Sequence, residues 1–356
     1  MLNTMTHKLI KKELDSAKNA SLAVGVVTPE GKFTDGQFNH DLNEGEIGDC
    51  IFEIGSTTKT FTSLLLAKLV QESKISLDEP ISSYKPAYKN ALSYDGKDIT
   101  FRHLSTHSSR LPREDMKKLR KRIKDNKQDK DNFYKHYTHE DLHQFFIDFD
   151  LKKEIGAKWG YSNIGIGLLG NVLAEIVGMT YEEAIKTHIL HPLNMKDTFI
   201  TGNEEQMKRY VQTYNKKGVM IPPIELPSIQ GAGAFKSTLN DMLIYLQHQM
   251  GMKESSLKEA IELTHEIHGN SSKKTMQMGL GWFIEQKKWS SFPIIHHGGT
   301  TIGFHTYCGF LKEEQIGIVV FSTIQLTTTR IIKILLKLTG LVNEDIAESI
   351  YLEHLA

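Results

Sequence analysis

The sequence predicts an α/β fold of the α+β type: an antiparallel sheet built from both ends of the chain, flanked by helices, with a mostly helical domain inserted. Strand patterns occur near the N-terminus, disappear, and return after about residue 275. Between them, apolar helical patterns alternate with loops. We therefore expect one unit with a sheet-containing part over 1–60 and 275–356 and a mostly helical part over 61–274.

The N-terminal elements follow from local patterns. An apolar stripe at helical spacing predicts a helix over His7–Lys18. The apolar run Leu22–Thr28, the turn Pro29–Gly31 and a second strand over Lys32–Gln37 predict a β-hairpin. The mostly apolar Thr60–Val70 predicts a helix that is buried nearly all round.

Strand patterns dominate the C-terminal part. They cover Leu280–Ile284, Phe292–His296, Gly303–Phe310 and Gln315–Phe321. A charged turn at residues 312–314 separates the last two, and a helix is expected over Thr328–Leu338. Strands from this end can pair with the N-terminal hairpin, which is why the sheet is assigned to both chain ends.

Composition excludes several classes of protein. The 356 residues carry 43 basic and 43 acidic side chains, so no basic footprint for nucleic acid covers the whole protein. Two cysteines make no disulfide framework, and 39% apolar residues is typical of a globular chain. No stretch approaches the roughly 18 apolar residues of a membrane helix. We therefore expect neither a nucleic-acid partner nor an integral membrane segment, and composition leaves the oligomeric state open.

Two segments of the chain are rich in charged residues. Residues 1–20 are charged throughout and lack the apolar core of a signal peptide, which predicts a cytoplasmic protein; an exported form trimmed of its leader would have the same sequence. Residues 113–130 hold nine basic and four acidic side chains, and such runs are usually solvated helices or loops.

Two short motifs are interpreted as coincidences. Gly165–Gly170 matches the dinucleotide pattern GxGxxG, but it lies inside an apolar helical run, where small residues serve helix packing. His139–His143 matches HExxH, which would make a zinc peptidase. Thr138 looks like the N-cap of that helix, with Asp141 three residues on, so the motif lies in an exposed first turn and a catalytic metal is not expected.

The S-x-x-K pattern offers a nucleophile beside a base. A serine three residues before a lysine on a helix shares its face, and a lysine kept neutral by burial accepts the serine proton. Four copies occur, at Ser56, Ser82, Ser255 and Ser271. Only Ser56, paired with Lys59, stands where an extended segment meets a glycine and then an apolar helix, with its N–H positioned for an oxyanion.

Two further patterns accompany it. Y-x-N at Tyr161 and Asn163 opens an apolar helix, and a tyrosine near a lysine loses its proton more easily. H-G-G-T at residues 297–300 follows a strand, where two glycines permit a close approach of backbone to a ligand; alone, a tight turn between strands is the simpler interpretation.

Together, S-x-x-K, Y-x-N and H-G-G in this order resemble the serine β-lactamase-like and penicillin-binding protein superfamily. The similarity is greatest to the branch of class C β-lactamases, low-molecular-weight penicillin-binding peptidases, D-amino-peptidases and esterases. Further similar segments extend it from about Leu22 to Phe321: Ile99–His107, Tyr161–Gly170, Ile189–Thr198 and Gly231–Thr238.

The resemblance implies a role for each residue. Ser56 would be the acylated nucleophile, Lys59 and Tyr161 would share proton transfer, and Asn163 would position the substrate amide. The substrate-binding set would also include His297, Gly298, Gly299 and Thr300, with the N–H groups of Ser56 and Thr300 forming the oxyanion hole.

Two departures from the family concern charge. His297 stands where many relatives have lysine, and an imidazole need not be charged at neutral pH, which weakens binding of an anionic β-lactam carboxylate. Arg110 stands where relatives usually have glycine, so a left-handed backbone there would be costly. Two interpretations are open for Arg110: a surface residue, or a cation that recruits an anionic substrate group with help from Arg113 or Lys117.

We therefore expect a serine acyl-transfer hydrolase for a small-molecule or short-peptide substrate, without metal or cofactor. A D-amino-acid peptidase (carboxypeptidase) or an esterase is preferred. The alternatives are a class C-type β-lactamase, a non-catalytic penicillin-binding or sensor module, and the zinc peptidase.

Overall fold

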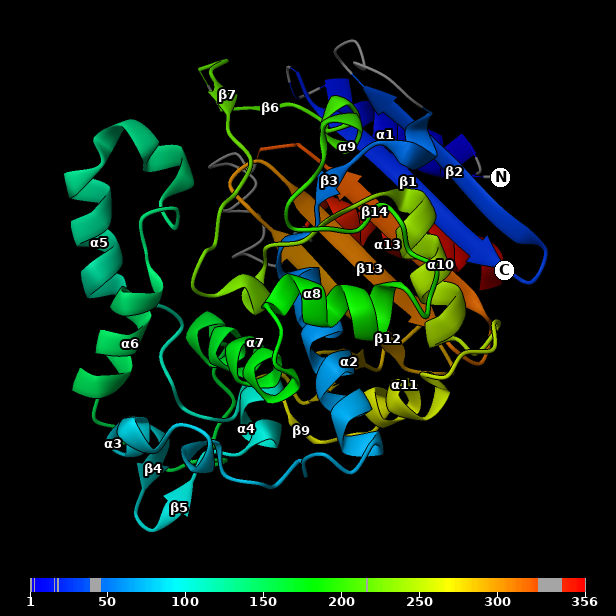
Figure 1. The fold of residues 1–356 in the computed structure, drawn as a ribbon. Helices are drawn as coiled ribbons and strands as arrows, with labels where there is room; N and C mark the ends of the chain where they lie inside the picture. The colour runs from blue at the N-terminus through cyan, green and yellow to red at the C-terminus, as the bar shows by residue number, and fades with distance from the viewer. Residues whose placement is uncertain are drawn as a thin grey trace.

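The computed structural model describes residues 2, 4–15, 17, 19–38, 46–215, 217–325 and 341–355. The helix expected over Thr328–Leu338 lies outside these residues. Within them, the predicted α/β architecture is confirmed, with one large antiparallel sheet and helices on both of its faces (Figure 1).

The sheet has eight strands in the order β2-β1-β14-β13-β12-β11-β10-β9, and every neighbouring pair is antiparallel. Its strands are β1 Ser21–Thr28, β2 Gly31–Phe38, β9 Gly269–Asn270, β10 Met276–Met278, β11 Phe283–Glu285, β12 Ile294–Thr300, β13 His305–Leu311 and β14 Ile316–Ser322. The N-terminal hairpin joins the C-terminal strands through the β1–β14 pair, in which Leu22 is opposite Ser322. Both chain ends therefore build one sheet, as the patterns predicted.

Helices lie on both faces of the sheet, and most of them come from the part of the chain between β2 and β9. They are α1 Thr4–Asp15, α2 Thr58–Gln71, α3 Lys89–Leu92, α4 Phe101–Ser105, α5 Met116–Asp125, α6 His139–Asp148, α7 Asn163–Val177, α8 Tyr181–Ile185, α9 Glu204–Lys208, α10 Leu239–Gln249, α11 Lys258–His265 and α13 Val342–Leu355. Three minor strand pairs complete the structure: β3 Phe52–Glu53 with β8 Lys236–Ser237, β4 Ser93–Tyr94 with β5 Lys97–Asp98, and β6 Thr213–Tyr214 with β7 Met220–Ile221. Among the described residues no single helix is long and apolar enough to span a membrane; one bent pair, α7 with residues 181–190, passes on length and composition alone.

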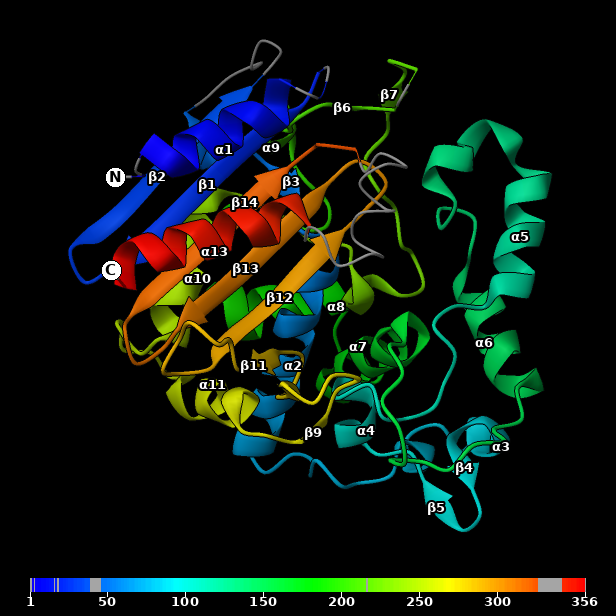
Figure 2. The same ribbon diagram turned by 180° about the vertical axis from the view of Figure 1, so that it is seen from behind.

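The central strands are buried on both faces, which explains their unbroken apolar runs. Alternate side chains of β1 separate two cores: Leu22 and Val24 pack under α1 and α13, whereas Ala23 and Val27 join the larger core on the opposite face. Figure 2 shows α1 and α13 lying across their face of the sheet. Helices α2, α10 and α11 pack on the other side.

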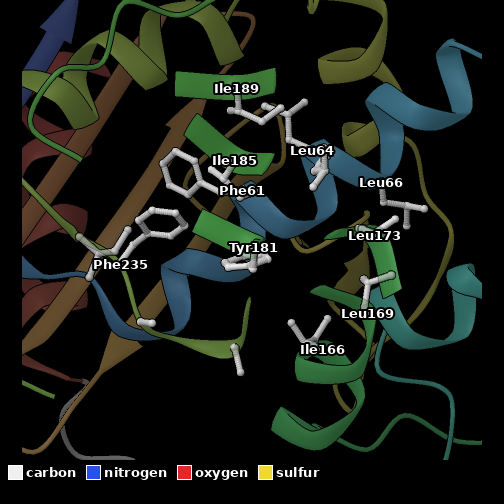
Figure 3. Close-up of a cluster of buried hydrophobic side chains, with 14 of the residues drawn as sticks. Phe61, Leu64, Leu66, Ile166, Leu169, Leu173, Tyr181, Ile185, Ile189 and Phe235 are labelled. Atoms are coloured by element: carbon white, nitrogen blue, oxygen red, sulfur yellow. The ribbon is translucent and has the colours of Figure 1, made fainter. Parts of the chain in front are cut away.

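Helix α2 is enclosed by other elements, as its mostly apolar sequence predicted. Phe61, Leu64 and Leu66 are buried, and Figure 3 shows them among side chains of α7 and α8, with Phe61 beside Phe235. Because this helix begins directly after Ser56, the burial fixes the position of the S-x-x-K motif.

Two predicted strands differ from the observed ones. The strand expected over Leu280–Ile284 begins only at Phe283, because Gly281 turns with φ +71° against α2. A Cβ there would lie 2.6 Å from Ser63 Oγ and 2.8 Å from Lys59 O. The strand expected over Phe292–His296 starts at Ile294 and continues to Thr300, so the H-G-G-T motif is strand and not a tight turn.

Candidate active site

Ser56 and Lys59 face each other where η2 (Gly55–Thr57) passes into α2. Gly55 makes the entry turn with φ +48°, a region that favours glycine. The Nζ atom of Lys59 lies 3.0 Å from Ser56 Oγ and also donates to the carbonyl of Ala232. The helix spacing thus brings a hydroxyl and an amine into direct hydrogen-bond contact, the arrangement that nucleophile activation requires.

Lys59 is fully buried, with 0% of its surface exposed. Burial lowers its pKa to about 7; the negative charge of Glu114 raises the pKa and the positive charge of Arg113 lowers it further. A substantial fraction of the amine is therefore neutral at neutral pH and able to accept the serine proton. This matches the pKa at which general-base catalysis is most efficient.

Tyr161 also contacts the amine. Its ring centre lies 4.9 Å from Lys59 Nζ, and the centre of the His107 ring lies 4.3 Å from it. Burial raises the pKa of the Tyr161 phenol, and hydrogen bonding to Ser56 opposes this effect. The phenol is protonated at neutral pH, so it suits a proton relay, while Lys59 is the better base.

The H-G-G-T segment forms the wall opposite α2. Strand β11 pairs with β12 only over residues 294–296, so residues 297–300 offer a free edge on that side. A Cβ on Gly55 would lie 2.9 Å from Thr300 N, and one on Gly299 would lie 2.0 Å from Ile54 O. The backbone of β12 therefore packs directly against the turn that carries Ser56, which places the two predicted oxyanion donors at one site.

His297 is a neutral acceptor. It is 2% exposed, and its Nδ1–H donates to Gly298 O at 2.6 Å, which leaves Nε2 with a free lone pair. Burial lowers its pKa to about 3, and the nearby charge of Lys59 contributes to the shift. This position therefore supplies no positive charge, as the replacement of lysine by histidine predicted.

Asn163 begins α7 and binds a carboxylate that the sequence patterns missed. Its Nδ2 donates to Glu114 Oε1 at 2.5 Å. Its backbone N–H donates to Arg113 O at 3.0 Å, and the Oγ of Ser162 donates to Pro112 O at 2.7 Å. The segment 112–114 is thus held to the start of α7 by main-chain and side-chain bonds together.

These groups line one cavity of about 690 Å³. Ser56, Tyr161, Asn163 and the residues His297, Gly298, Gly299 and Thr300 all border it. Five residues of the run 113–130 also border it, although the run was predicted to be solvated: the charged pair Arg113 and Glu114, and the apolar Met116, Leu119 and Ile123. In the sequence, Arg113 and Glu114 are marked only by following closely on Ile99–His107, a segment that resembles the family.

Arg110 is placed away from this cavity. Its φ of +70° is the left-handed conformation that a glycine would adopt without strain. Its Nη1 donates to Lys158 O at 3.2 Å, and it is not among the residues that line the cavity. This placement favours the interpretation of Arg110 as a surface residue. Arg113 borders the cavity instead, with its guanidinium carbon 5.0 Å from the centre of the Tyr161 ring.

The two discounted motifs are structural. The HExxH residues start α6, where Thr138 and Asp141 form a capping box. In the described part of the chain no cluster of three or more metal-ligating side chains exists. Gly167 of the GxGxxG match packs against Ile229 inside α7, where a Cβ would lie 2.5 Å from that side chain. Cys50 and Cys308 are buried free thiols.

Comparison with known proteins identifies relatives over almost the whole chain. The family model described as Beta-lactamase matches residues 7–336. The chain is 29% identical over 286 residues to the D-alanyl-D-alanine-carboxypeptidase/endopeptidase AmpH of Escherichia coli (strain K12), covering 77% of this chain and 71% of that protein. It is 25% identical over 360 residues to a Beta-lactamase of the same organism, covering 90% and 88%.

Solved structures share the fold. A class C beta lactamase from Rhodobacter sphaeroides superposes with a TM-score of 0.77 at 20% identity, covering 98% of this chain and all of that one. The octameric penicillin-binding protein homologue from Pyrococcus abyssi gives a TM-score of 0.76 at 24% identity, covering 94% and 77%. At these identities the likeness establishes the architecture.

Proposed function

Because the chain belongs to the Beta-lactamase family and is an enzyme of the serine-hydrolase type, we propose that it hydrolyses D-amino-acid-containing peptides or small esters through an acyl-enzyme at Ser56. The observation that carries this proposal is the fully buried amine of Lys59, 3.0 Å from Ser56 Oγ and with a pKa near 7. A module that only bound its ligand would have no need of so costly a buried base.

The reaction would proceed in two halves. In the first, Lys59 accepts the Ser56 proton as Oγ attacks the substrate carbonyl, and the N–H groups of Ser56 and Thr300 stabilise the oxyanion. The proton then passes through Tyr161 to the leaving amine or alkoxide, and an ester to Ser56 remains. In the second half, water gives up a proton to the same pair and attacks this ester; the pair returns the proton to Ser56 Oγ as the acyl–oxygen bond breaks and the acid is released.

The charge distribution favours peptides and esters over β-lactams. His297 is neutral where many relatives carry lysine, so it offers no cation to a β-lactam carboxylate. Arg113 is a cation on the cavity wall and has no ion-pair partner among the residues that the structure describes. The carboxylate at the end of a peptide substrate could pair with the Arg113 guanidinium there.

Much of the remaining wall is apolar. Helix α5 contributes Met116, Leu119 and Ile123, and the loops opposite contribute Phe133, Ile224 and Leu226. Burying apolar atoms against such a wall stabilises a complex by roughly 25 cal/mol per Å². We therefore expect a substrate with an apolar group beside its scissile bond.

A hydrolysis panel tests the proposal. The purified protein is given p-nitrophenyl esters, peptides ending in D-Ala-D-Ala and a chromogenic cephalosporin, with Ser56→Ala as the matched control. We expect turnover of an ester or a D-peptide that Ser56→Ala lacks. A second candidate, a class C-type β-lactamase, is favoured by the similarity to proteins of that name; rapid turnover of the cephalosporin with none of the other substrates would establish it instead.

A further inference from the structure

Glu114 is a carboxylate inside the candidate active site that S-x-x-K, Y-x-N and H-G-G do not include. It borders the cavity and accepts a hydrogen bond from Asn163 Nδ2 at 2.5 Å. The hydroxyl of Tyr134 faces both side chains; burial and then the charge of Glu114 raise the pKa of that phenol. Three polar groups from three different segments thus meet at the edge of the catalytic pair.

The bond to Glu114 determines which way the Asn163 amide points. A carboxylate only accepts hydrogen bonds, so the NH₂ group must face Glu114 and Oδ1 must face away. Oδ1 is buried and has no hydrogen-bond partner in the described part of the protein. Asn163 therefore offers an acceptor beside the catalytic pair, which suits an N–H of the substrate or of the Lys59 ammonium.

Glu114 is also the acid among the polar and titratable groups around the Lys59 amine. Ser56 contacts the amine by a hydrogen bond and Tyr161 by its ring. The other groups are Arg113 and Glu114 from the loop before α5, His297 from β12, and His107 from the segment after α4. Arg113 disfavours a proton on Lys59, and Glu114 favours one. The two histidines are buried, and burial lowers the pKa of each, so they carry no compensating charge.

We propose that Glu114 is a positioning residue for the reaction: its carboxylate holds the Asn163 amide in one orientation and supplies negative charge beside Lys59. The inference rests on the proposed acyl-transfer function. Because the Asn163 N–H donates to Arg113 O and Ser162 Oγ donates to Pro112 O, replacing the Glu114 side chain leaves residues 112 and 113 anchored to the start of α7. The effect of the substitution is therefore expected in the chemistry and not in the fold.

The test is the pH dependence of kcat/KM for Glu114→Gln. Removing the charge makes protonated Lys59 less stable, so its pKa falls and the neutral base persists at lower pH. The acid limb should move down by about one pH unit or more, the order that an effective dielectric of about 20 gives for charges within about 10 Å of each other. At the plateau, a weaker base and a released Asn163 should lower kcat/KM about threefold to tenfold.

Three further variants separate charge from shape. Glu114→Asp keeps the charge and should restore the acid limb, whereas Tyr134→Phe removes only a hydroxyl and should leave the limb in place. Glu140→Gln, an equivalent neutralisation in the exposed first turn of α6, should change neither parameter. Circular dichroism and the melting temperature of each variant report on folding, and covalent labelling of Ser56 by a fluorophosphonate reports on the wild-type function.

The outcomes are distinct. If wild-type protein is neither labelled nor active, the proposed function fails. If it is active and Glu114→Gln keeps the wild-type acid limb, or moves it upward, the role given to Glu114 is wrong. If Glu114→Gln does not fold, Glu114→Asp decides: its shorter side chain keeps the charge but gives up the bond to Asn163, so an unshifted acid limb with a lowered plateau supports the proposal, and a wild-type plateau overturns it.

Discussion

Gly299→Ala provides a severe test of how β12 supports the oxyanion site. The added Cβ would lie 2.0 Å from Ile54 O and 2.4 Å from Thr306 Oγ1. Reaching even 3.0 Å requires about 1 Å of movement between β12 and the turn that carries Ser56. A misplacement of about 1 Å can cost about 10²-fold in rate, and loss of an oxyanion donor costs about 10²–10³-fold.

The matched control is the neighbouring glycine. A Cβ on Gly298 would find Thr306 O at 3.3 Å as its nearest heavy atom, so Gly298→Ala requires little movement. We expect Gly299→Ala to lower kcat by about 10²-fold or more, with Gly298→Ala within a few-fold of wild type. The assay is ester hydrolysis, with the rate of fluorophosphonate labelling as a second readout. Equal losses in both variants, or none in Gly299→Ala, would refute this reasoning.

Four further predictions concern proton transfer, charge and metal. The acid limb of kcat/KM should lie near pH 7, because Lys59 must lose its proton to act as a base and burial lowers its pKa to about 7. A pH–rate profile with its acid limb near pH 10 would show that the pKa of Lys59 is not lowered. Lys59→Ala and Tyr161→Phe should each cost about 10²–10⁴-fold, and the double variant should be little worse than either, which single-turnover kinetics would show; losses that multiply would mean independent roles. Arg113→Ala should raise KM several-fold for carboxylate-bearing substrates and spare neutral esters, with the effect reduced by salt, whereas Arg110→Ala should change neither KM; the opposite ranking would return the cation to Arg110. His139→Ala should retain full activity in the presence of a chelator, and loss of activity would revive the zinc hypothesis.

The contact between Ser56 and Lys59 could be predicted because its geometry is local. Ser56 and Lys59 are three residues apart at the start of a helix, and the apolar sequence of α2 already implies that the lysine is buried. Of the four S-x-x-K copies, only the one at Ser56 is preceded by a glycine and followed by an apolar helix, and this distinguishes it from the others. The sheet was predictable for a similar reason, since its strands are continuous apolar runs at both ends of the chain.

The parts that could not be predicted depend on long-range packing. The carbonyl of Ala232, which accepts from Lys59, is 173 residues away in sequence, and no local pattern marks it. Glu114 lies in a charged run, and such runs are usually exposed to solvent. It borders the cavity because its segment packs against the start of α7. Two interpretations of Arg110 were open because its charge says nothing of its direction; in the fold its backbone is left-handed and its guanidinium donates to Lys158 O.

Intact-protein mass spectrometry after treatment with a fluorophosphonate tests the central claim most directly. The account predicts one covalent adduct on the wild-type protein, located to Ser56 by peptide mapping, and none on Ser56→Ala. Ser255→Ala and Ser271→Ala, which carry the same S-x-x-K spacing in exposed or partly exposed segments, should be labelled like the wild type. An adduct of undiminished yield on folded Ser56→Ala would contradict the assignment of Ser56 as the nucleophile.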